Sequence, residues 1–274
     1  MRTLLLTSLV TLFTSVAAAQ QPQAPAAEPF VPRSGMPGKD VVWVPSPTAT
    51  VEKMMDVAKV TPNDFVIDLG SGDGRNVIAA AKRGARSLGV EYNPDMVALS
   101  QRLAKEAGVA DKAQFVQGDM YEADISKASV MALFLLPVNL NKLAPKFLDL
   151  KPGSRIVGNT FGIDGWEPDY RETVPEGSDC SSWCEILLWI VPAKVAGTWA
   201  LPNGTLTLTQ QYQTVQGTLT IDGKEQTVST GKLNGEEVTF VAGGLNYQGT
   251  VKGNRIEGTV TTPSGTHKWS ATKK

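Results

Sequence analysis

The 274-residue sequence contains little that would bind a metal or a nucleic acid. It has one histidine and two cysteines, and its formal net charge is −1. Non-specific nucleic-acid binding requires a basic surface, which this balance does not indicate. The histidine, His267, is far in sequence from Cys180 and Cys184, and a metal site needs more ligands than this pair supplies. We therefore expect neither a nucleic-acid partner nor a bound metal.

The two cysteines leave two interpretations open. In an exported chain Cys180 and Cys184 are candidates for a disulfide, although the small loop that they close would add little stability. Two partly buried thiols at the start of a strand explain the pattern equally well.

The sequence also lacks a long apolar run at its start. Leu4–Val16 is shorter than the roughly 20 residues of a spanning helix, and Thr and Ser interrupt it. It follows a positive Met1-Arg2 and precedes the small residues Ala17-Ala18-Ala19, a pattern typical of a secretory signal peptide over residues 1–19. We expect export to a periplasm or the extracellular space, with no membrane span after cleavage. An uncleaved membrane anchor is the alternative.

Residues 20–40 are rich in Ala, Pro and Gln and show no hydrophobic period. Such a composition buries too little apolar surface to fold by itself. We expect a disordered tether between the signal peptide and the first domain.

The most informative segment present is a strand, a glycine-rich turn and a helix start. Phe65–Leu69 is apolar except for Asp68, glycines stand at positions 70, 72 and 74, and an alanine-rich helical pattern runs from Arg75 to Arg83. An open α/β sheet binds nucleotide-like ligands at such a turn. Asp68 and Asp73 bracket the loop, so a cationic ligand suits it better than a diphosphate. The glycine spacing also differs from the nicotinamide and flavin fingerprint.

Strands and helices alternate on both sides of this loop. Further strands are expected at 87–91, 114–117, 128–136, 155–159 and 184–191, and further helices at 50–60, 93–108 and 139–150. This alternation predicts right-handed βαβ units. The predicted fold of residues 41–195 is therefore α/β, Rossmann-like, with a mostly parallel sheet and helices on both faces.

The character of the sequence changes after residue 195. From 196 to 274 there is no helical period, and turn pairs such as Asn203-Gly204 and Asn234-Gly235 separate short alternating segments. Regularly spaced turns of this kind predict about eight antiparallel strands in a small all-β barrel or sandwich. The sequence assigns no role to this C-terminal domain.

Two acids are expected at the same rim of the parallel sheet as the glycine loop. Glu91 closes the second strand, 23 residues after Asp68, where an acid can accept hydrogen bonds from both ribose hydroxyls. Asp119 follows the third strand, and its carboxylate could accept a hydrogen bond from an adenine amino group. The loop and the two acids together fit an adenosine that carries a positive charge.

At this point the sequence resembles a known family. Asp68-Leu69-Gly70-Ser71-Gly72-Asp73-Gly74 is similar to motif I of the class I S-adenosylmethionine-dependent methyltransferases. Glu91, Gly118-Asp119 and Leu150–Gly153 fall where that superfamily has its later motifs. A finer resemblance is to one branch of this superfamily. That branch contains the mitochondrial protein-lysine methyltransferases that act on the ATP synthase c-subunit and on the adenine nucleotide carrier, with their bacterial relatives. It is carried by Val44–Pro47, Gly70–Arg75, Leu135–Pro137 and Trp166–Asp169, and it leaves the β domain unexplained.

The resemblance implies S-adenosylmethionine as cofactor and a set of residues around it. Those residues are Asp68, Gly70, Ser71, Gly72 and Asp73 in the loop, Glu91 at the ribose, Asp119 near the adenine, and Trp43 and Pro45 closing over the cofactor. For Trp43 and Trp166, ordinary packing is an equally good interpretation. No catalytic residue is identified.

Methyl transfer needs little acid–base assistance, because the main tasks are to align a nucleophile and to exclude water. The methyltransferase region contains no histidine, which excludes a histidine base. Its fourth strand ends in Leu133–Pro137 rather than in the Asn-Pro-Pro-Tyr type of motif of base and glutamine methyltransferases. A dry, aromatic-lined mouth would help a lysine to lose its proton.

We therefore expect a protein side chain, lysine, as the methyl acceptor. A small-molecule or lipid methyltransferase is one alternative. An exported, non-catalytic envelope protein that kept the cofactor pocket is another, because S-adenosylmethionine is made in the cytoplasm.

Overall fold

The computed structural model describes residues 30–175 and 178–274. The predicted signal peptide, residues 1–19, lies outside the described residues, as does the first half of the predicted tether. No helix in the described part of the chain is long and apolar enough to cross a membrane.

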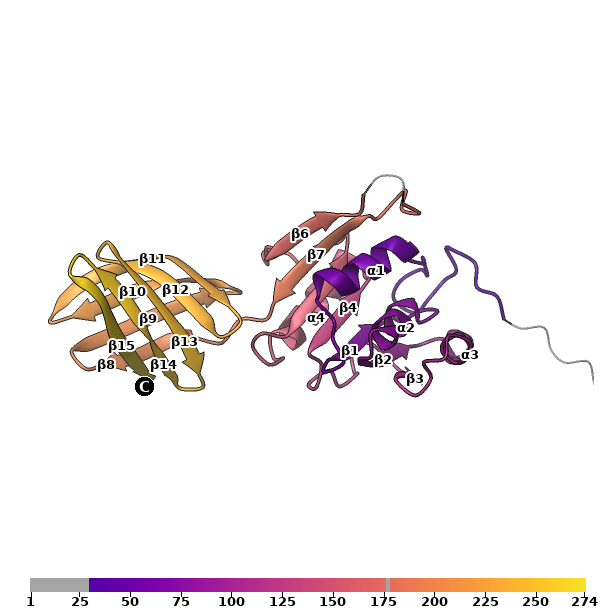
Figure 1. Ribbon diagram of the computed structural model, residues 1–274, viewed down its shortest axis with the longest axis horizontal. Helices are drawn as coiled ribbons and strands as arrows, with labels where there is room; N and C mark the ends of the chain where they lie inside the picture. The colour runs from indigo at the N-terminus through magenta and orange to yellow at the C-terminus, as the bar shows by residue number, and fades with distance from the viewer. Residues whose placement is uncertain (1–29, 176–177) are drawn as a thin grey trace, which may run out of the picture. The chain divides into compact units, whose positions relative to one another are not determined.

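The first domain contains a seven-stranded sheet (Figure 1). Its elements are α1 (Thr48–Val57), β1 (Phe65–Leu69), α2 (Arg75–Lys82), β2 (Arg86–Glu91), α3 (Pro94–Glu106), β3 (Ala113–Gln117), β4 (Val130–Leu133), α4 (Pro137–Phe147), β5 (Arg155–Asn159), β6 (Tyr170–Thr173) and β7 (Glu185–Ile190). The strand order is β3-β2-β1-β4-β5-β7-β6, and the pairs from β3 to β5 are parallel. The predicted Rossmann-like α/β fold is confirmed.

Alternate residues of the central strands pack against helices on opposite faces of the sheet, as the pleat of a strand requires. Val66 of β1 lies in a buried cluster with residues of α1 and α2, such as Met54 and Ala80. Its neighbour Ile67 lies in a second cluster with Leu143 and Phe147 of α4. Both faces of the sheet are therefore covered, which leaves the strand ends as the accessible edge.

The structure corrects the sequence-based expectations at three points. β6 was not predicted, because it is a short strand whose side chains are mostly exposed and so show no hydrophobic pattern. β7 pairs antiparallel with β5 and with β6. The predicted strand 128–136 is shortened to β4, because Pro137 occupies the first position of α4, where its fixed φ favours a helix start.

The second domain is a closed eight-stranded antiparallel barrel, so the choice between a barrel and a sandwich is settled (Figure 1). Its strands are β8 (Gly197–Leu201), β9 (Gly204–Gln211), β10 (Thr214–Ile221), β11 (Lys224–Asn234), β12 (Glu237–Ala242), β13 (Leu245–Lys252), β14 (Arg255–Thr262) and β15 (Gly265–Lys273). Trp199 and Tyr247 are buried in its core, and Phe240 stacks on Tyr247 with ring centroids 4.9 Å apart. These aromatic residues therefore have a packing role.

The glycine loop between β1 and α2 needs its glycines for steric reasons. Gly74 caps α2 with a φ of 81°, in the left-handed region that favours glycine. A Cβ on Gly74 would come within 2.5 Å of the Phe115 ring. A Cβ on Gly72 would come within 2.5 Å of Trp43 Nε1. The loop is thus shaped by close approach of a β3 side chain and of a segment that precedes α1.

Candidate functional site

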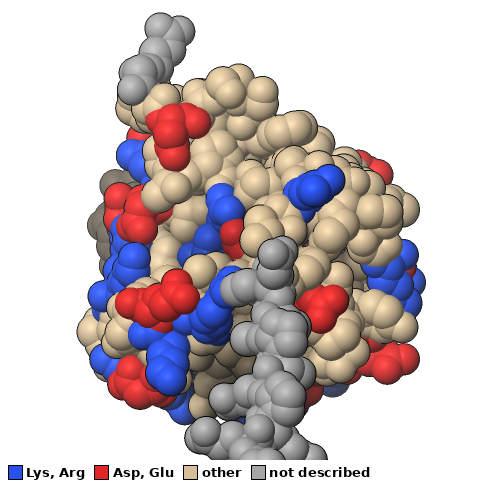
Figure 2. Space-filling view, turned by 90° about the vertical axis from the view of Figure 1, so that its right-hand side faces the viewer, with Lys and Arg blue, Asp and Glu red and all other residues tan. Residues whose placement is uncertain are grey.

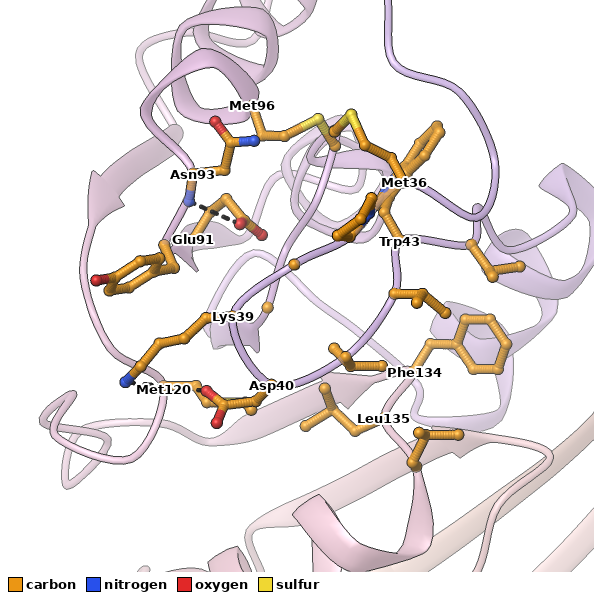
Figure 3. A pocket seen from close by; sticks show the side chains of 18 of the residues that line it. Met36, Lys39, Asp40, Trp43, Glu91, Asn93, Met96, Met120, Phe134 and Leu135 are labelled. Carbon is orange, nitrogen blue, oxygen red and sulfur yellow. Dashed lines mark hydrogen bonds and ion pairs between the residues drawn. The ribbon is translucent and has the colours of Figure 1, made fainter.

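A cavity of about 230 Å³ lies where the ends of β1, β2, β3 and β4 meet (Figure 3). Gly70 lines it from the end of β1, Glu91 from β2, Asp119 from the turn after β3, and Leu135 from the turn after β4. In parallel sheets the carboxyl ends of strands share one edge, and ligands bind there. The cavity therefore lies at the edge of the sheet where the sequence predicted the binding site.

Glu91 lies at this cavity with both carboxylate oxygens already engaged. Oε2 accepts a hydrogen bond of 2.9 Å from the backbone N–H of Gly72, and Oε1 accepts one of 3.0 Å from that of Asn93. The carboxylate thus ties the glycine loop to the start of α3. Each oxygen has a further lone pair available for a ligand.

Asp119 lies in the same cavity and forms an ion pair with Lys39. It also accepts a 2.8 Å hydrogen bond from the backbone N–H of Tyr121. The hydrogen bond from Lys39 is the main reason why the pKa of Asp119 lies below its usual value, and the bond from Tyr121 acts in the same direction. Asp119 is therefore ionised and able to accept a hydrogen bond from a ligand.

Asp68 is only 3% exposed and does not line the cavity. Its Oδ2 accepts a 3.1 Å hydrogen bond from Asn76 Nδ2. Burial raises the pKa of Asp68 well above its usual value, and the charges of Glu91 and Asp73 add to this effect, whereas the bond from Asn76 opposes it. A cation that reached Asp68 would favour its ionised form.

Four of the other predicted site residues do not line the cavity. The backbone N–H of Ser71 donates to Val90, and its buried hydroxyl has no hydrogen-bond partner among the described residues. Asp73 accepts two hydrogen bonds from the guanidinium of Arg75, at 2.9 and 2.5 Å. Gly72 contributes through its backbone, as described above. Pro45 lies just beyond Val44, which does line the cavity.

Trp43 lines the cavity together with a segment that the sequence placed in or beside the tether. We call this segment, Met36–Val44, the N-terminal strap. The backbone N–H of Trp43 donates to the carbonyl of Met36 at 2.8 Å, and the carbonyl of Trp43 accepts a bond of 2.8 Å from the N–H of Gly35. Figure 3 shows Met36 and Trp43 beside Met96 of α3. The short apolar run Val41–Val44 was the only local signal for the strap.

We expect Lys39→Met to strengthen S-adenosylmethionine binding by about threefold, in line with the small energies of exposed ion pairs. The change frees Asp119 for the ligand and removes a positive charge near a cationic molecule. Titration calorimetry of the full chain would measure the effect, with the exposed Lys82→Met as the matched control. Weaker binding by Lys39→Met would instead mean that Lys39 contacts the ligand directly.

Aromatic side chains line the cavity at the positions Phe134, Phe161 and Trp183. The sequence did not predict them as site residues, because they come from three distant segments without a shared motif. Phe134 lies across the cavity from Glu91 (Figure 3). Trp166, in contrast, is fully buried in the core of the first domain, and its carbonyl accepts a 2.7 Å bond from Trp189 Nε1, so packing explains it.

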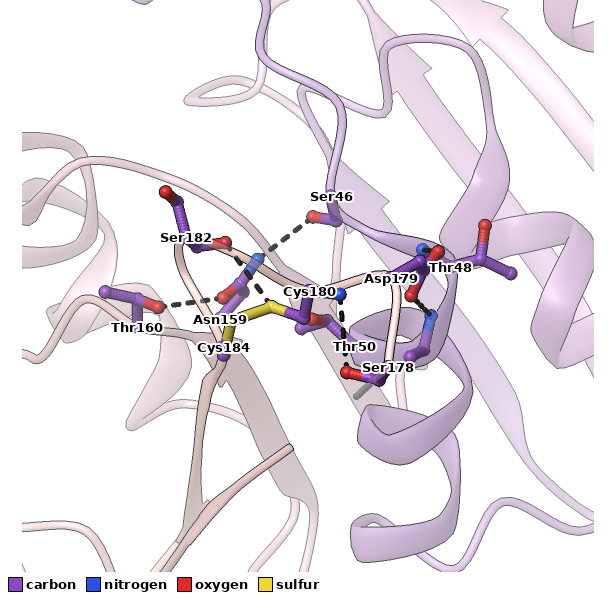
Figure 4. The surroundings of a disulfide bond; sticks show 11 residues. Ser46, Thr48, Thr50, Asn159, Thr160, Ser178, Asp179, Cys180, Ser182 and Cys184 are labelled. Carbon is purple, nitrogen blue, oxygen red and sulfur yellow. Dashed lines mark hydrogen bonds between the residues drawn. A yellow bond between two sulfur atoms is a disulfide. The ribbon is translucent and has the colours of Figure 1, made fainter. Parts of the chain in front are cut away.

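Cys180 and Cys184 form a disulfide bond, so the interpretation as free thiols is wrong (Figure 4). The bond closes a loop that contains Ser181, Ser182 and Trp183. It therefore lies beside the aromatic end of the cavity.

Positive and negative side chains are intermixed over the face of the molecule shown in Figure 2, and no large area of a single sign is visible there. This distribution agrees with the net charge of −1. The visible face offers no continuous basic track for a nucleic-acid backbone.

A family model described as "ANTKMT methyltransferase domain" matches residues 68–170. A protein-lysine N-methyltransferase of Saccharolobus islandicus is 41% identical over 142 residues, which cover 50% of this chain and 88% of that protein. The lysine N-methyltransferase of the ATP synthase c-subunit from Mus musculus is 34% identical over 156 residues. That match covers 56% of this chain and 61% of the mouse protein, less than two thirds of its length.

Among solved structures, an RNA methyltransferase from Salinibacter ruber in complex with S-adenosyl-L-homocysteine is similar to the first domain. The sequence identity is 44%, the TM-score is 0.51, and the match covers 56% of this chain and 96% of that one.

Proposed function

Because this chain belongs to the class I S-adenosylmethionine-dependent methyltransferases related to the lysine methyltransferases of the ATP synthase c-subunit and of adenine nucleotide translocase, we propose that it methylates lysine side chains of a protein. The observation that carries this proposal is the 41% identity to a protein-lysine N-methyltransferase over 88% of that relative's length. The aromatic end of the cavity supports the same acceptor on chemical grounds.

The residues at the cavity fit the adenosine part of S-adenosylmethionine. Glu91 presents a carboxylate for the ribose hydroxyls, and Asp119 presents one for the adenine amino group. The side chains of Met96, Met120 and Leu135 supply the apolar surface that a purine needs. When bound, the cofactor supplies a methyl group that is already activated by a sulfonium sulfur.

The task of the protein is then to hold a neutral amine in line with that methyl group. Lysine is protonated in water, and an apolar surrounding lowers the pKa of its ammonium, which favours release of the proton to solvent. Phe134, Phe161 and Trp183 provide such a surrounding. In the transfer a nitrogen–carbon bond forms as the sulfur–carbon bond breaks, and alignment of the reacting atoms is the main source of rate.

Incubation of the full chain with tritium-labelled S-adenosylmethionine and an extract of the source cells would test the proposal. Label should enter the protein fraction, and mass spectrometry should locate it on lysine side chains. The Glu91→Ala variant, in which cofactor binding should be strongly weakened, serves as the control. Label confined to solvent-extractable material would indicate a lipid or small-molecule acceptor. Label confined to RNA would contradict a protein acceptor and align this chain with the RNA methyltransferase from Salinibacter ruber.

We also propose that the chain is exported. The signal pattern of residues 1–19 and the Cys180–Cys184 disulfide support this location, because disulfides persist mainly in oxidising compartments. Cell fractionation with mass spectrometry of the N-terminus is the test. A mature terminus near residue 20 in an envelope fraction is expected, and an intact Met1 in the cytoplasm would contradict export.

A further inference from the structure

The aromatic end of the cavity has a chemistry of its own, distinct from the end that carries Glu91 and Asp119. Building on the proposed function, we propose that Phe134, Phe161 and Trp183 form the subsite for the acceptor amine. In this subsite Trp183 determines which alkylamine is accepted, and the Cys180–Cys184 disulfide positions it.

The three rings pack against one another and form one aromatic wall of the cavity. The rings of Phe134 and Phe161 are nearly parallel, at 7°, with centroids 6.0 Å apart. Trp183 is tilted by 58° against Phe134, with centroids 6.1 Å apart. All three line the cavity that Gly70 and Glu91 also line. An acceptor packed against this aromatic wall would therefore enter the same cavity as the cofactor.

The rim of the cavity carries apolar side chains that are open to solvent. Trp183 is 43% exposed, and the cavity-lining residues Val42 and Leu136 are 52% and 38% exposed. Exposed apolar side chains gathered at one mouth are characteristic of a binding surface. A protein that presents a lysine would cover this rim.

The backbone at Trp183 is held in an uncommon conformation. Its φ is 58°, in the left-handed region that residues other than glycine rarely adopt. Such conformations persist only where the surrounding structure enforces them, and they often occur at binding sites.

Three sets of contacts hold this segment in place (Figure 4). The disulfide joins Cys180 to Cys184, one residue before β7 begins. The carboxylate of Asp179 accepts hydrogen bonds of 3.0 and 2.9 Å from the backbone N–H groups of Thr48 and Ala49, at the start of α1. The hydroxyl of Thr50 lies 3.3 Å from Cys180 Sγ. The loop is thus fixed to a helix and to a strand, and Trp183 projects from it.

The chemistry of this aromatic wall selects an alkyl chain whose nitrogen is neutral or methylated, rather than a strongly hydrated primary ammonium. Methylated ammonium groups bind to aromatic faces by cation–π attraction and by apolar contact. The subsite should therefore accept the unbranched side chain of lysine and its methylated forms. The segment that matches the family model ends at residue 170, so Trp183 and both cysteines lie beyond it.

The disulfide makes this subsite dependent on its redox state. A phosphine reductant breaks the S–S bond, gives two thiols by taking up protons from water, and becomes a phosphine oxide with the oxygen of that water. Without the bond, Trp183 loses one of the contacts that enforce its conformation. Acceptor binding should weaken, whereas cofactor binding at Glu91 should not change.

The test uses the full chain saturated with S-adenosylhomocysteine and titrated with Nα-acetyl-trimethyllysine methylamide, measured by calorimetry. Trp183→Ala should weaken probe binding by about tenfold, as the loss of one desolvated cation–π contact implies, and Trp183→Phe should restore most of it. Tyr170→Ala, at an exposed aromatic residue outside the cavity, is the matched control. The affinity for S-adenosylhomocysteine should be the same in all four proteins.

A second arm tests the disulfide. The reductant should weaken probe binding by the wild type, and the double variant Cys180→Ser/Cys184→Ser should bind weakly with or without it. Unchanged probe binding by Trp183→Ala would overturn the subsite, and an equal loss of cofactor affinity would show that Trp183 is merely structural.

Failure of the proposed subsite can be distinguished from failure of the proposed function. Lysine labelling that persists in the extract while Trp183→Ala binds the probe normally would overturn only the subsite. Trp183-dependent probe binding without any labelled lysine would support the subsite and overturn lysine in a protein as its acceptor.

Discussion

Glu91→Ala is expected to weaken S-adenosylmethionine binding by about a hundredfold or more, because a charge-assisted hydrogen bond contributes about 1.5–3 kcal/mol and at least two are lost. The substitution removes the acceptor for the ribose hydroxyls. It also releases the backbone N–H groups of Gly72 and Asn93, which Glu91 holds at 2.9 and 3.0 Å. Both changes act on the same cofactor, so the effect is large. Titration calorimetry with S-adenosylmethionine and with S-adenosylhomocysteine would measure it.

Two variants separate the role in binding from a role in folding. Glu91→Gln keeps one acceptor oxygen and should lose less affinity than Glu91→Ala. Glu106→Ala, at an exposed position near the end of α3, should bind as the wild type does. An affinity of Glu91→Ala within a few-fold of the wild type, with an unchanged melting temperature, would show that the ribose lies elsewhere.

The second large effect is expected at Asp68, whose pKa in the free protein is raised mainly by burial. If the cationic methionyl end of the cofactor lies beside this carboxyl, as the family resemblance implies, binding restores the ionised form and releases a proton. The affinity should then rise with pH, by up to about tenfold per unit, until the raised pKa of the free protein is passed. Above that pKa the affinity should be constant.

Asp68→Asn should abolish this pH dependence and weaken binding most at high pH, by about a hundredfold for the loss of a buried ion pair. Calorimetry in two buffers of different ionisation enthalpy would detect the released proton directly. Asp111→Asn, at an exposed position before β3, is the matched control. A pH-independent affinity of the wild type would contradict a contact between Asp68 and the cofactor.

The same shift has a consequence for the stability of the cofactor-free protein. A carboxyl whose pKa is raised on folding stabilises the folded state fully below its unfolded pKa, near 3.9. That contribution is lost as the pH rises through the raised value. The free energy of unfolding of Asp68→Asn should therefore fall less with rising pH than that of the wild type.

Local sequence signals predicted where the glycine loop and the two acids lie in the fold. Gly74 is needed at the helix start because its φ is positive and the Phe115 ring lies close to it. The glycine-rich turn in the sequence indicates this tight backbone conformation. Glu91 and Asp119 meet at one cavity because parallel strands place their carboxyl ends at a common edge. Both features follow from the alternation of strands and helices that the sequence displays.

The parts that long-range contacts create could not be predicted. The order of the N-terminal strap comes from the contact of Trp43 with Gly72 and from the ion pair of Lys39 with Asp119, across 80 residues of chain. No hydrophobic period marks that segment. The aromatic end likewise joins Phe134, Phe161 and Trp183. Their meeting depends on the antiparallel pairing of β7 with β5. The sequence predicted the mostly parallel sheet but not the direction of this strand.

The closure of the C-terminal barrel has a consequence for the order in which this domain assembles. Each strand from β8 to β15 pairs with its neighbour in the sequence, so hairpins can form early at little cost in chain entropy. Only the contact of β15 with β8 joins distant segments, through the pairs Thr272–Ala200 and Lys273–Trp199, whereas β9 and β10 share eight pairs. This seam should close last during folding. Native-state hydrogen exchange should find its amides the first in the barrel to open.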